Sequence, residues 1–213
     1  MISEKQRSAE AACEYVKDGM IVGLGTGSTA EFAVKKIGEL VRNGLSIRGI
    51  PTSDATKILA ESEGIPLIDF SETMSIDLTI DGADEIDANL NMIKGGGAAL
   101  LREKIVASAS REEIIIVSGS KLVQQLGAFP LPVEVIPFGW QVVFNQLESL
   151  QGNPELRLKQ GQPSVTDQGN FIIDCHFRKI ENPEQLEQHL NMIPGVVERG
   201  LFINLCTRMI IAV

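Results

Sequence analysis

The chain has 213 residues, 44% of them hydrophobic and 22% charged, with a formal net charge of −9 at pH 7. This length and composition predict a globular protein that needs neither disulfides nor a structural metal to fold. Acidic residues outnumber basic ones and no Lys/Arg cluster occurs, which argues against nucleic acid as the main partner. No apolar run approaches the roughly 18 residues of a membrane span, and the polar stretch 1–10 is unlike a signal peptide.

The first part of the sequence alternates between helix and strand patterns. Ser3 and Gln6 have capping-box spacing, which predicts a helix that runs to about residue 18 and ends at Gly19. Such alternation is typical of a parallel sheet with crossover helices, and short apolar strands are typical of a sheet covered on both faces. Three later helices are expected: one that ends at Asn43, one that ends at Gly64 and one over residues 98–109. The expected strands are 20–24, 47–50, 67–70, 75–80 and 113–117.

The pattern changes near Phe129, after which prolines are frequent. Expected strands there are 133–136, 170–176 and 196–199, and expected helices are 140–150 and 183–190. This stretch could form a small α+β lobe of its own. Two last apolar runs, 201–205 and 209–213, could return to the first sheet.

Cysteines and histidines are few and scattered. Cys13, Cys175 and Cys206 lie far apart without a C-x-x-C pair, so we expect reduced thiols in a cytoplasmic protein and no zinc site. The two histidines, His176 and His189, leave little material for a His-based catalytic or metal site.

A glycine-rich turn, Gly23-Leu-Gly-Thr-Gly-Ser-Thr-Ala30, joins a predicted strand to a predicted helix. Glycines permit a tight turn, and a helix N-terminus presents N–H groups suited to phosphate. Ser28 and Thr29 add hydroxyl donors. A dinucleotide fingerprint also fits, but the acid expected at the end of the next strand is missing, and no Walker lysine follows. Phosphate binding is therefore favoured, with a purely structural turn as the alternative.

Two further motifs follow predicted strand ends. The stretch Asp81-Gly-Ala-Asp-Glu-Ile-Asp87 carries carboxylates that could bond sugar hydroxyls, move protons or bind Mg²⁺, or could be a solvated acidic loop. Lys94-Gly-Gly-Gly97 could form an anion nest or oxyanion hole, with Lys94 and the N–H groups of Gly95 and Gly96 as candidate donors, or could be a flexible loop.

Single charged residues give weaker signals. Leu101 and Ile105 are expected to mark the buried side of their helix, which places Glu103 in solvent. Lys121 follows Ser118-Gly-Ser at another strand end, and by itself it favours a solvated lysine. Lys5 carries no special signal.

Together these motifs resemble the ribose-5-phosphate isomerase A family. The resemblance extends in order over nearly the whole chain. It also includes Thr52-Ser-Asp-Ala55, Arg102-Glu-Lys-Ile105, Phe129-Pro-Leu-Pro-Val-Glu-Val-Ile-Pro137, Ile193-Pro-Gly-Val-Val-Glu198 and Gly200-Leu-Phe202.

The resemblance implies a Rossmann-like α/β domain formed by residues 1–128 and 200–213, with an inserted ferredoxin-like α+β lobe at 129–199. It implies interconversion of D-ribose 5-phosphate and D-ribulose 5-phosphate through an enediolate, in the pentose phosphate pathway. No metal or organic cofactor is expected, and the assembly implied is a homodimer or a tetramer. The chain departs from the family near Cys206–Arg208, where an acid is common, and it ends before most members do; both departures concern the last strand.

The resemblance also implies the site. Glu103 would be the proton acceptor, which overrides the solvated position that periodicity favours, and Asp81, Asp84 and Lys94 would complete the catalytic set. Asp81 or Asp84 could assist ring opening. The implied substrate-binding residues are Thr26, Gly27, Ser28, Thr29, Asp81, Gly82, Ala83, Asp84, Lys94, Gly95, Gly96, Gly97 and Lys121.

Two other functions remain open from the residues alone. A sugar-phosphate sensor without catalysis would share the phosphate turn and the glycine nest, although no helix-turn-helix segment or basic face is visible. A nucleotide-dependent oxidoreductase would use Gly25 and Gly27, although the missing strand-end acid counts against it.

Overall fold

The computed structural model describes residues 3–212 and divides into two compact units, each with its own sheet and core. The first unit comprises Met1–Ala83, Arg102–Leu122 and Asn204–Val213. The second comprises Asp84–Leu101 and Val123–Ile203. The second unit thus contains residues 84–101 in addition to the lobe expected at 129–199. Within the described residues, no helix combines the length and apolar character needed to cross a membrane.

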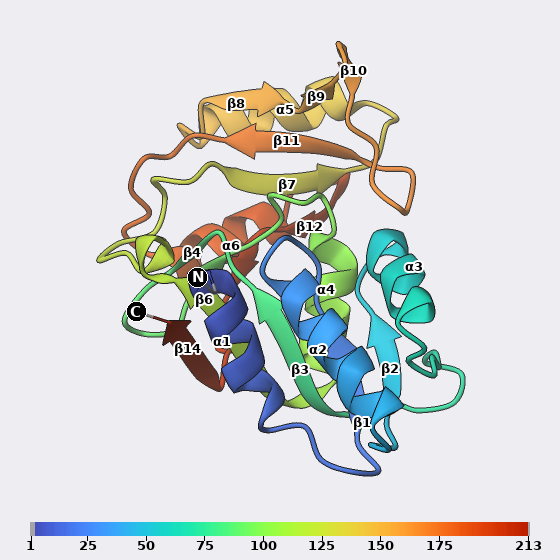
Figure 1. Cartoon of the computed structure of the whole chain (residues 1–213). Coiled ribbons are helices and arrows are strands. Elements are labelled where there is room, and N and C mark those ends of the chain that lie inside the picture. The colour runs from blue at the N-terminus through green and yellow to red at the C-terminus, as the bar shows by residue number, and fades with distance from the viewer. Residues whose placement is uncertain (1–2, 213) are drawn as a thin grey trace. The chain divides into compact units, whose positions relative to one another are not determined.

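The first unit is built on a five-stranded parallel sheet in the order β14-β6-β3-β1-β2, as the alternating sequence pattern predicts (Figure 1). The chain leaves β1 toward β2 on one side, and β3 then pairs with β1 on the other side. The strand order therefore reverses between β1 and β3, and open α/β sheets commonly bind ligands at the carboxyl ends of such strands. The strands are β1 (Ile21–Leu24), β2 (Arg48–Pro51), β3 (Ile76–Gly82), β6 (Ser110–Ser118) and β14 (Arg208–Ala212).

Helices cover both faces of this sheet. One core combines apolar residues of α1, α2 and α3 with Val22 and Leu24 of β1. On the opposite face Val106 of α4 packs with Ile50 and Ile76. Figure 1 shows α1 and α2 on the same side of the strands. The helices are α1 (Glu4–Cys13), α2 (Ala30–Arg42), α3 (Asp54–Ser62) and α4 (Leu100–Ser108), and a 3-10 turn, η1 (Gly119–Lys121), follows β6.

Several local predictions for the first unit are confirmed and two are wrong. Ser3 caps α1 by accepting a hydrogen bond from the Gln6 N–H. That helix ends at Cys13 and not near residue 18. Beyond Cys13 the backbone N–H groups up to the buried Val16 donate to the carbonyl three residues earlier, which is a turn and not an α-helical pattern. Residues 67–70 form no strand; Leu67 makes only an isolated parallel bridge to Gly49. The expected return of the chain to the first sheet is confirmed for β14, and residue 213 lies outside the described part.

The second unit contains a four-stranded antiparallel sheet in the order β12-β7-β11-β8. Its chain order, β7-α5-β8-β11-α6-β12, is the β-α-β-β-α-β arrangement of ferredoxin-like folds, as expected. Leu131, Val133 and Ile173 alternate onto one face of the sheet and pack in the unit's core. These elements are β7 (Leu131–Val135), α5 (Trp140–Ser149), β8 (Pro154–Leu156), β11 (Phe171–Cys175), α6 (Pro183–Asn191) and β12 (Val196–Arg199).

A three-stranded sheet, β13-β5-β4, belongs to the same unit. This sheet explains why residues 84–101 belong to the second unit, because β4 pairs with β5 and β5 pairs with β13. The prediction that residues 201–205 return to the first sheet is therefore wrong. The strands are β4 (Glu85–Ile86), β5 (Met92–Ile93) and β13 (Leu201–Phe202), and a two-stranded hairpin joins β9 (Leu158–Lys159) to β10 (Gln162–Pro163).

Candidate active site

The turn after β1 is shaped by a close approach between Gly25 and Asp81. Asp81 ends the buried part of β3 and is 1% exposed. Its Oδ1 accepts hydrogen bonds from the N–H of Thr26 at 3.1 Å and of Gly82 at 2.7 Å. A Cβ on Gly25 would lie 2.3 Å from that oxygen, so only glycine fits there. Gly25 and Asp81 thus bring the first glycine motif and the first acid together at the point where the strand order reverses.

The Thr26 hydroxyl points into a buried cluster of hydroxyl groups. Its Oγ1 lies 2.7 Å from the Thr52 hydroxyl, 2.8 Å from Ser53 and 3.0 Å from Thr56. Thr52 and Thr56 donate onward to the carbonyls of Leu24 and Gly25. This network fixes the path of the β1–α2 turn and uses the Thr26 side chain for structure.

The beginning of α2 keeps polar groups available for an anion. Gly27 has φ +106°, a left-handed conformation that favours glycine. The N–H groups of Ser28 and Thr29 have no hydrogen-bond partner within residues 3–212. The Lys5 Nζ, on the first turn of α1, donates to the Ser28 hydroxyl at 2.8 Å. A lysine, a serine hydroxyl and backbone N–H groups therefore meet at one helix N-terminus, as phosphate binding requires.

Glu103 is buried, contrary to the expectation from periodicity. It is 5% exposed, whereas Ile105, which we expected on the buried side, is 45% exposed. Leu100, Glu103 and Ala107 share one face of α4 and all are buried. The signal in the sequence is thus a carboxylate on the apolar stripe of a helix, where an ionisable side chain is rare unless it is paired.

Lys121 lies in η1, directly after β6, and is half-buried. In the register of the sheet, Gly82 of β3 pairs with Ile116 of β6, two residues before Ser118. The carboxyl ends of β1, β3 and β6 therefore present the Thr26 turn, Asp81 to Ala83, and Lys121 at the same edge of the first unit's sheet.

In the second unit, Asp84 and the glycine run make a matching pair. The Gly96 N–H donates to Asp84 Oδ2 at 2.8 Å, and a Cβ on Gly96 would lie 2.7 Å from Asp84 Oδ1. A side chain at Gly96 would therefore displace this carboxylate, whereas one at Gly25 would also meet the backbone of Asp81. The Gly96 N–H, expected as a candidate oxyanion donor, binds Asp84 in this structure. Gly97 is exposed next to it.

Lys94 is among the largest fully buried side chains of residues 3–212 and is 2% exposed. Its Nζ lies 5.4 Å from the centroid of the Phe202 ring, a cation–π contact, and its N–H donates to the carbonyl of Gly200. Burial holds the lysine side chain in place directly before the glycine run. It is therefore no solvated surface residue.

The remaining acids of the 81–87 stretch are structural. Glu85 accepts hydrogen bonds from the N–H groups of Gly127 and Phe129, and Asp87 Oδ1 accepts from Asn89 and Asn91 in the β4–β5 turn. In the part of the chain that the structure describes, no three His, Cys, Asp or Glu side chains are arranged to hold a metal ion.

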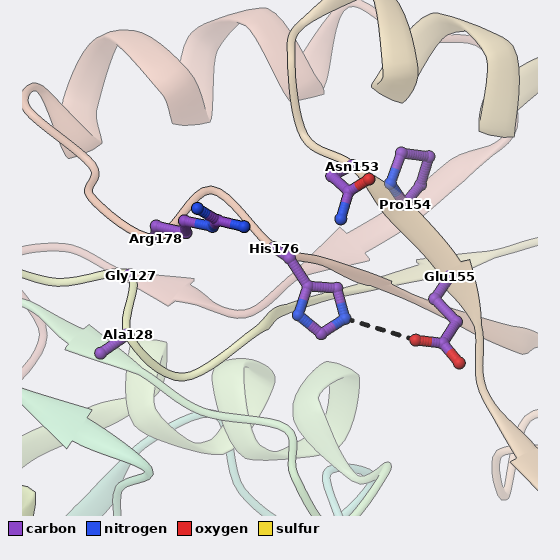
Figure 2. Close-up of a pocket in the computed structure, with 7 residues that line it drawn as sticks. All are labelled: Gly127, Ala128, Asn153, Pro154, Glu155, His176 and Arg178. Carbon is purple, nitrogen blue, oxygen red and sulfur yellow. Dashed lines mark ion pairs between the residues drawn. The ribbon is translucent and has the colours of Figure 1, made fainter.

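One pocket of the second unit contains none of the expected site residues. Figure 2 shows His176 and Glu155 pointing toward each other across it, with His176 Nε2 3.5 Å from Glu155 Oε2. The pocket is lined by Gly127, Ala128, Asn153, Pro154, Glu155, His176 and Arg178.

Comparison with known proteins identifies the family. The sequence model of the family described as ribose 5-phosphate isomerase A (phosphoriboisomerase A) matches residues 48–213. The chain belongs to the ribose 5-phosphate isomerase A family. Among its relatives, ribose-5-phosphate isomerase A of Bacillus mycoides is 52% identical over 212 residues, covering 99% of this chain and 96% of the relative. That of Gloeobacter violaceus is 54% identical over 210 residues, covering 98% and 91%.

Solved structures agree with this assignment. Ribose 5-phosphate isomerase A from Methanocaldococcus jannaschii superimposes with a TM-score of 0.94 at 42% identity and covers 98% of this chain and 94% of its own. A D-ribose-5-phosphate isomerase solved in complex with phospho-erythronic acid gives a TM-score of 0.95 at 41% identity, covering 98% and 93%. The expected α/β fold class is thereby confirmed.

Within this family framework, sequence reasoning missed two groups of residues. Lys5 is one turn into α1, and only the structure brings it to Ser28, 23 residues away. Thr52 and Ser53 belong to the resemblance and Thr56 does not, and the sequence predicts no hydroxyl cluster of these residues around Thr26. No local pattern reports such contacts, because they depend on how neighbouring strands are ordered.

Proposed function

We propose that the protein interconverts D-ribose 5-phosphate and D-ribulose 5-phosphate. The observation that carries this is family membership over nearly the whole chain, at about 50% identity to relatives with that name. A non-catalytic sugar-phosphate sensor is not favoured, because Glu103 is a buried carboxylate at a position where a sensor needs only polar contacts.

The reaction needs one base that moves a proton between C2 and C1 of the open-chain sugar. We assign this role to Glu103, since a positioned carboxylate contributes about 10²- to 10⁴-fold to such a step. Burial keeps this carboxylate away from bulk water, which favours proton transfer with the substrate over exchange with solvent.

The developing enediolate and the sugar hydroxyls need donors and acceptors. We assign the cationic role to Lys94, which is buried, and the polar contacts to Asp81, Asp84 and the glycine run. Asp84 keeps its Oδ1 for a sugar hydroxyl while its Oδ2 holds Gly96. Asp81 or Asp84 would also assist opening of the furanose ring.

The phosphate group of the substrate fits the beginning of α2. Ser28, Thr29, the N–H groups there and Lys5 supply hydrogen bonds and a positive charge. Lys121, half-buried at the same sheet edge, supplies a second cation for the substrate. We assign to Gly82 and Ala83 contacts between their backbone and the substrate. Thr26 and Gly27 contribute to substrate binding by forming the turn before α2.

Assembly, location and cofactor use follow from the same assignment. We expect a homodimer, with a tetramer as the alternative, in the cytoplasm, and turnover without a metal or organic cofactor. Light scattering of the purified protein measures the assembly.

The direct test is conversion of ribose 5-phosphate to ribulose 5-phosphate, followed by absorbance, with purified protein in the presence of EDTA. Rapid turnover is the expected result. A folded protein without turnover that still binds ribose 5-phosphate in a calorimeter would instead identify a sensor.

A further inference from the structure

The glycine run of the second unit is held from one side by a single arginine. Arg157 follows β8, and its Nη1 donates to the carbonyl oxygens of Gly95 at 2.9 Å and of Gly96 at 3.2 Å. Two consecutive carbonyl groups therefore point at one guanidinium nitrogen. Glycines have no side chain with which to hold themselves, and each loses more conformational freedom on ordering than any other residue. The Ala98 N–H also donates to the Gly95 carbonyl at 3.0 Å, so Arg157 adds an external contact to a turn that has one internal hydrogen bond.

The contact also decides where the N–H groups of the run point. The structure has no cis peptide bond among the described residues, and in a trans peptide the C=O and N–H groups point in opposite directions. With the Gly95 carbonyl directed at Arg157, the Gly96 N–H is directed away from it, and there it meets Asp84 Oδ2 at 2.8 Å. With the Gly96 carbonyl also directed at Arg157, the Gly97 N–H points away from the guanidinium too.

Arg157 is itself held in a fixed orientation. Its Nε and Nη2 donate to the two carboxylate oxygens of Asp174 at 2.8 and 2.5 Å, and the side chains of this pair are only 17% and 19% exposed. The backbone of Arg157 extends the β8–β11 ladder through its N–H, which donates to the Ile172 carbonyl. A planar guanidinium can bind a carboxylate with one edge and carbonyls with its remaining nitrogen, which a lysine ammonium cannot reproduce.

The sheet of the second unit explains how this pair reaches the glycine run. Leu156 and Ile173 point into the apolar core, so the alternating residues Arg157 and Asp174 lie on the opposite face. Pro132, paired with Asp174 in the register, is on that face too, and a Cβ on Gly95 would lie 3.2 Å from its Cγ. The second face of the sheet thus seats the glycine run, and Arg157 fixes its orientation there.

We propose that Arg157, oriented by Asp174, is a positioning residue for isomerisation: it fixes the Gly95–Gly96–Gly97 peptides so that Asp84 and the Gly97 N–H are aligned for the sugar. Arg157 does not touch the substrate in this scheme. The proposal rests on the proposed function, and it adds a residue pair that sequence motifs alone did not single out.

The test compares Arg157→Ala with a matched arginine in the same unit. Arg199→Ala is the control, because Arg199 also pairs with a carboxylate, that of Glu187, and is likewise 17% exposed. We expect Arg157→Ala to lower kcat by roughly 10- to 100-fold, the range of a lost orienting contact, whereas Arg199→Ala keeps kcat and loses only thermal stability. Arg157→Lys should recover little of the loss, since it cannot hold Asp174 and both carbonyls.

Chemical rescue separates positioning from general destabilisation. Millimolar methylguanidinium should restore part of the kcat of Arg157→Ala and leave Arg199→Ala unchanged. Hydrogen exchange of the Gly96 amide, read by NMR, should be faster in Arg157→Ala and normal in Arg199→Ala. A folded Arg157→Ala variant with wild-type kcat and KM would overturn the proposal, as would a loss of kcat shared by Arg199→Ala. Absence of turnover in the wild-type chain would instead reject the proposed function, so the two failures are distinguishable.

Discussion

Two aspartates depend on two glycines, Asp81 on Gly25 and Asp84 on Gly96. In each pair the carboxylate occupies the space that a Cβ would fill and accepts a hydrogen bond from the backbone of its turn. Each unit therefore contains one such pair, in which a residue of a glycine motif and an acid fit against each other. A carboxylate held by N–H groups keeps its orientation without support from longer side chains.

The role of Glu103 can be tested by removing its charge and little else. Glu103→Gln should lower kcat by at least about 100-fold because amide oxygen is a far weaker base, while ribose 5-phosphate still binds in a calorimeter. Glu112→Gln, an exposed position on β6, is the matched control and should keep full activity. Full activity of Glu103→Gln would remove this residue from the mechanism.

The fit between Gly25 and Asp81 predicts a second result. Gly25→Ala places a Cβ 2.3 Å from Asp81 Oδ1, so the turn or the carboxylate must move, and kcat should fall by roughly 10-fold or more. Gly119→Ala is the control, since nothing lies within 4 Å of its added Cβ and its φ is not positive. Steady-state kinetics of both variants test this prediction. If Gly25→Ala had the same kcat as Gly119→Ala, Asp81 would need no fixed position.

At the scale of elements, most strands and helices were predictable because apolar periodicity reflects burial. The failures have physical causes. Residues 67–70 are largely apolar, but only Leu67 forms a bridge. Leu201 and Phe202 pair with β5, a two-residue strand too short to be recognised from sequence. Periodicity predicts the wrong side of α4 for Glu103 because Ile105, an apolar residue, is exposed. The resemblance predicts the candidate site residues that lie in motifs, whereas the contacts of Lys5 and Arg157 depend on the tertiary fold.

Strand β7 contains a buried acid outside the candidate site. Glu134 is fully buried, and its Oε1 accepts hydrogen bonds from Thr166 and Asn170. Burial is the main cause that raises the pKa of this carboxyl above its ordinary value of 4.5, and the hydrogen bonds from Asn170 and Thr166 partly oppose it. The folded chain therefore binds its proton more tightly than the unfolded chain does.

This shift predicts how stability depends on pH. Because the folded-state pKa of Glu134 is raised, its contribution to the free energy of unfolding falls as pH rises from about 4.5 through the raised pKa. Glu134→Gln cannot ionise and keeps an acceptor oxygen, so its stability relative to wild type should increase over the same interval. Urea unfolding at acidic and neutral pH measures this. Glu148→Gln, exposed on α5, should show no such trend, and a pH-independent difference for Glu134→Gln would contradict the prediction.

At the scale of the whole molecule, the chain passes between its two units at residues 83/84, 101/102, 122/123 and 203/204. Helix α4 contains residues of both, with Leu100 and Leu101 in the second unit and Arg102 onward in the first. Loss of either unit therefore removes part of this helix. We expect the two units to unfold together.

One probe in each unit can test this expectation. Trp140, the single tryptophan, packs in the core of the second unit. Cys13 lies in the first unit, 2% exposed, and burial raises the pKa of its thiol to about 12, so it should react with thiol reagents only after unfolding. In a Cys175→Ala, Cys206→Ala background, Trp140 fluorescence and Cys13 labelling should give the same guanidinium midpoint. Separate midpoints would show independent units.

The divided second unit also limits how genes of this family can be recombined. Ile93, Leu126 and Leu201 are buried in its core, and all three lie outside residues 129–199. A hybrid gene that exchanges only the codons for 129–199 between two relatives would therefore assemble this core from both parents. Crossovers placed at 83/84 and 203/204 would carry the whole core, together with the segment 102–122 of the other unit, from a single parent.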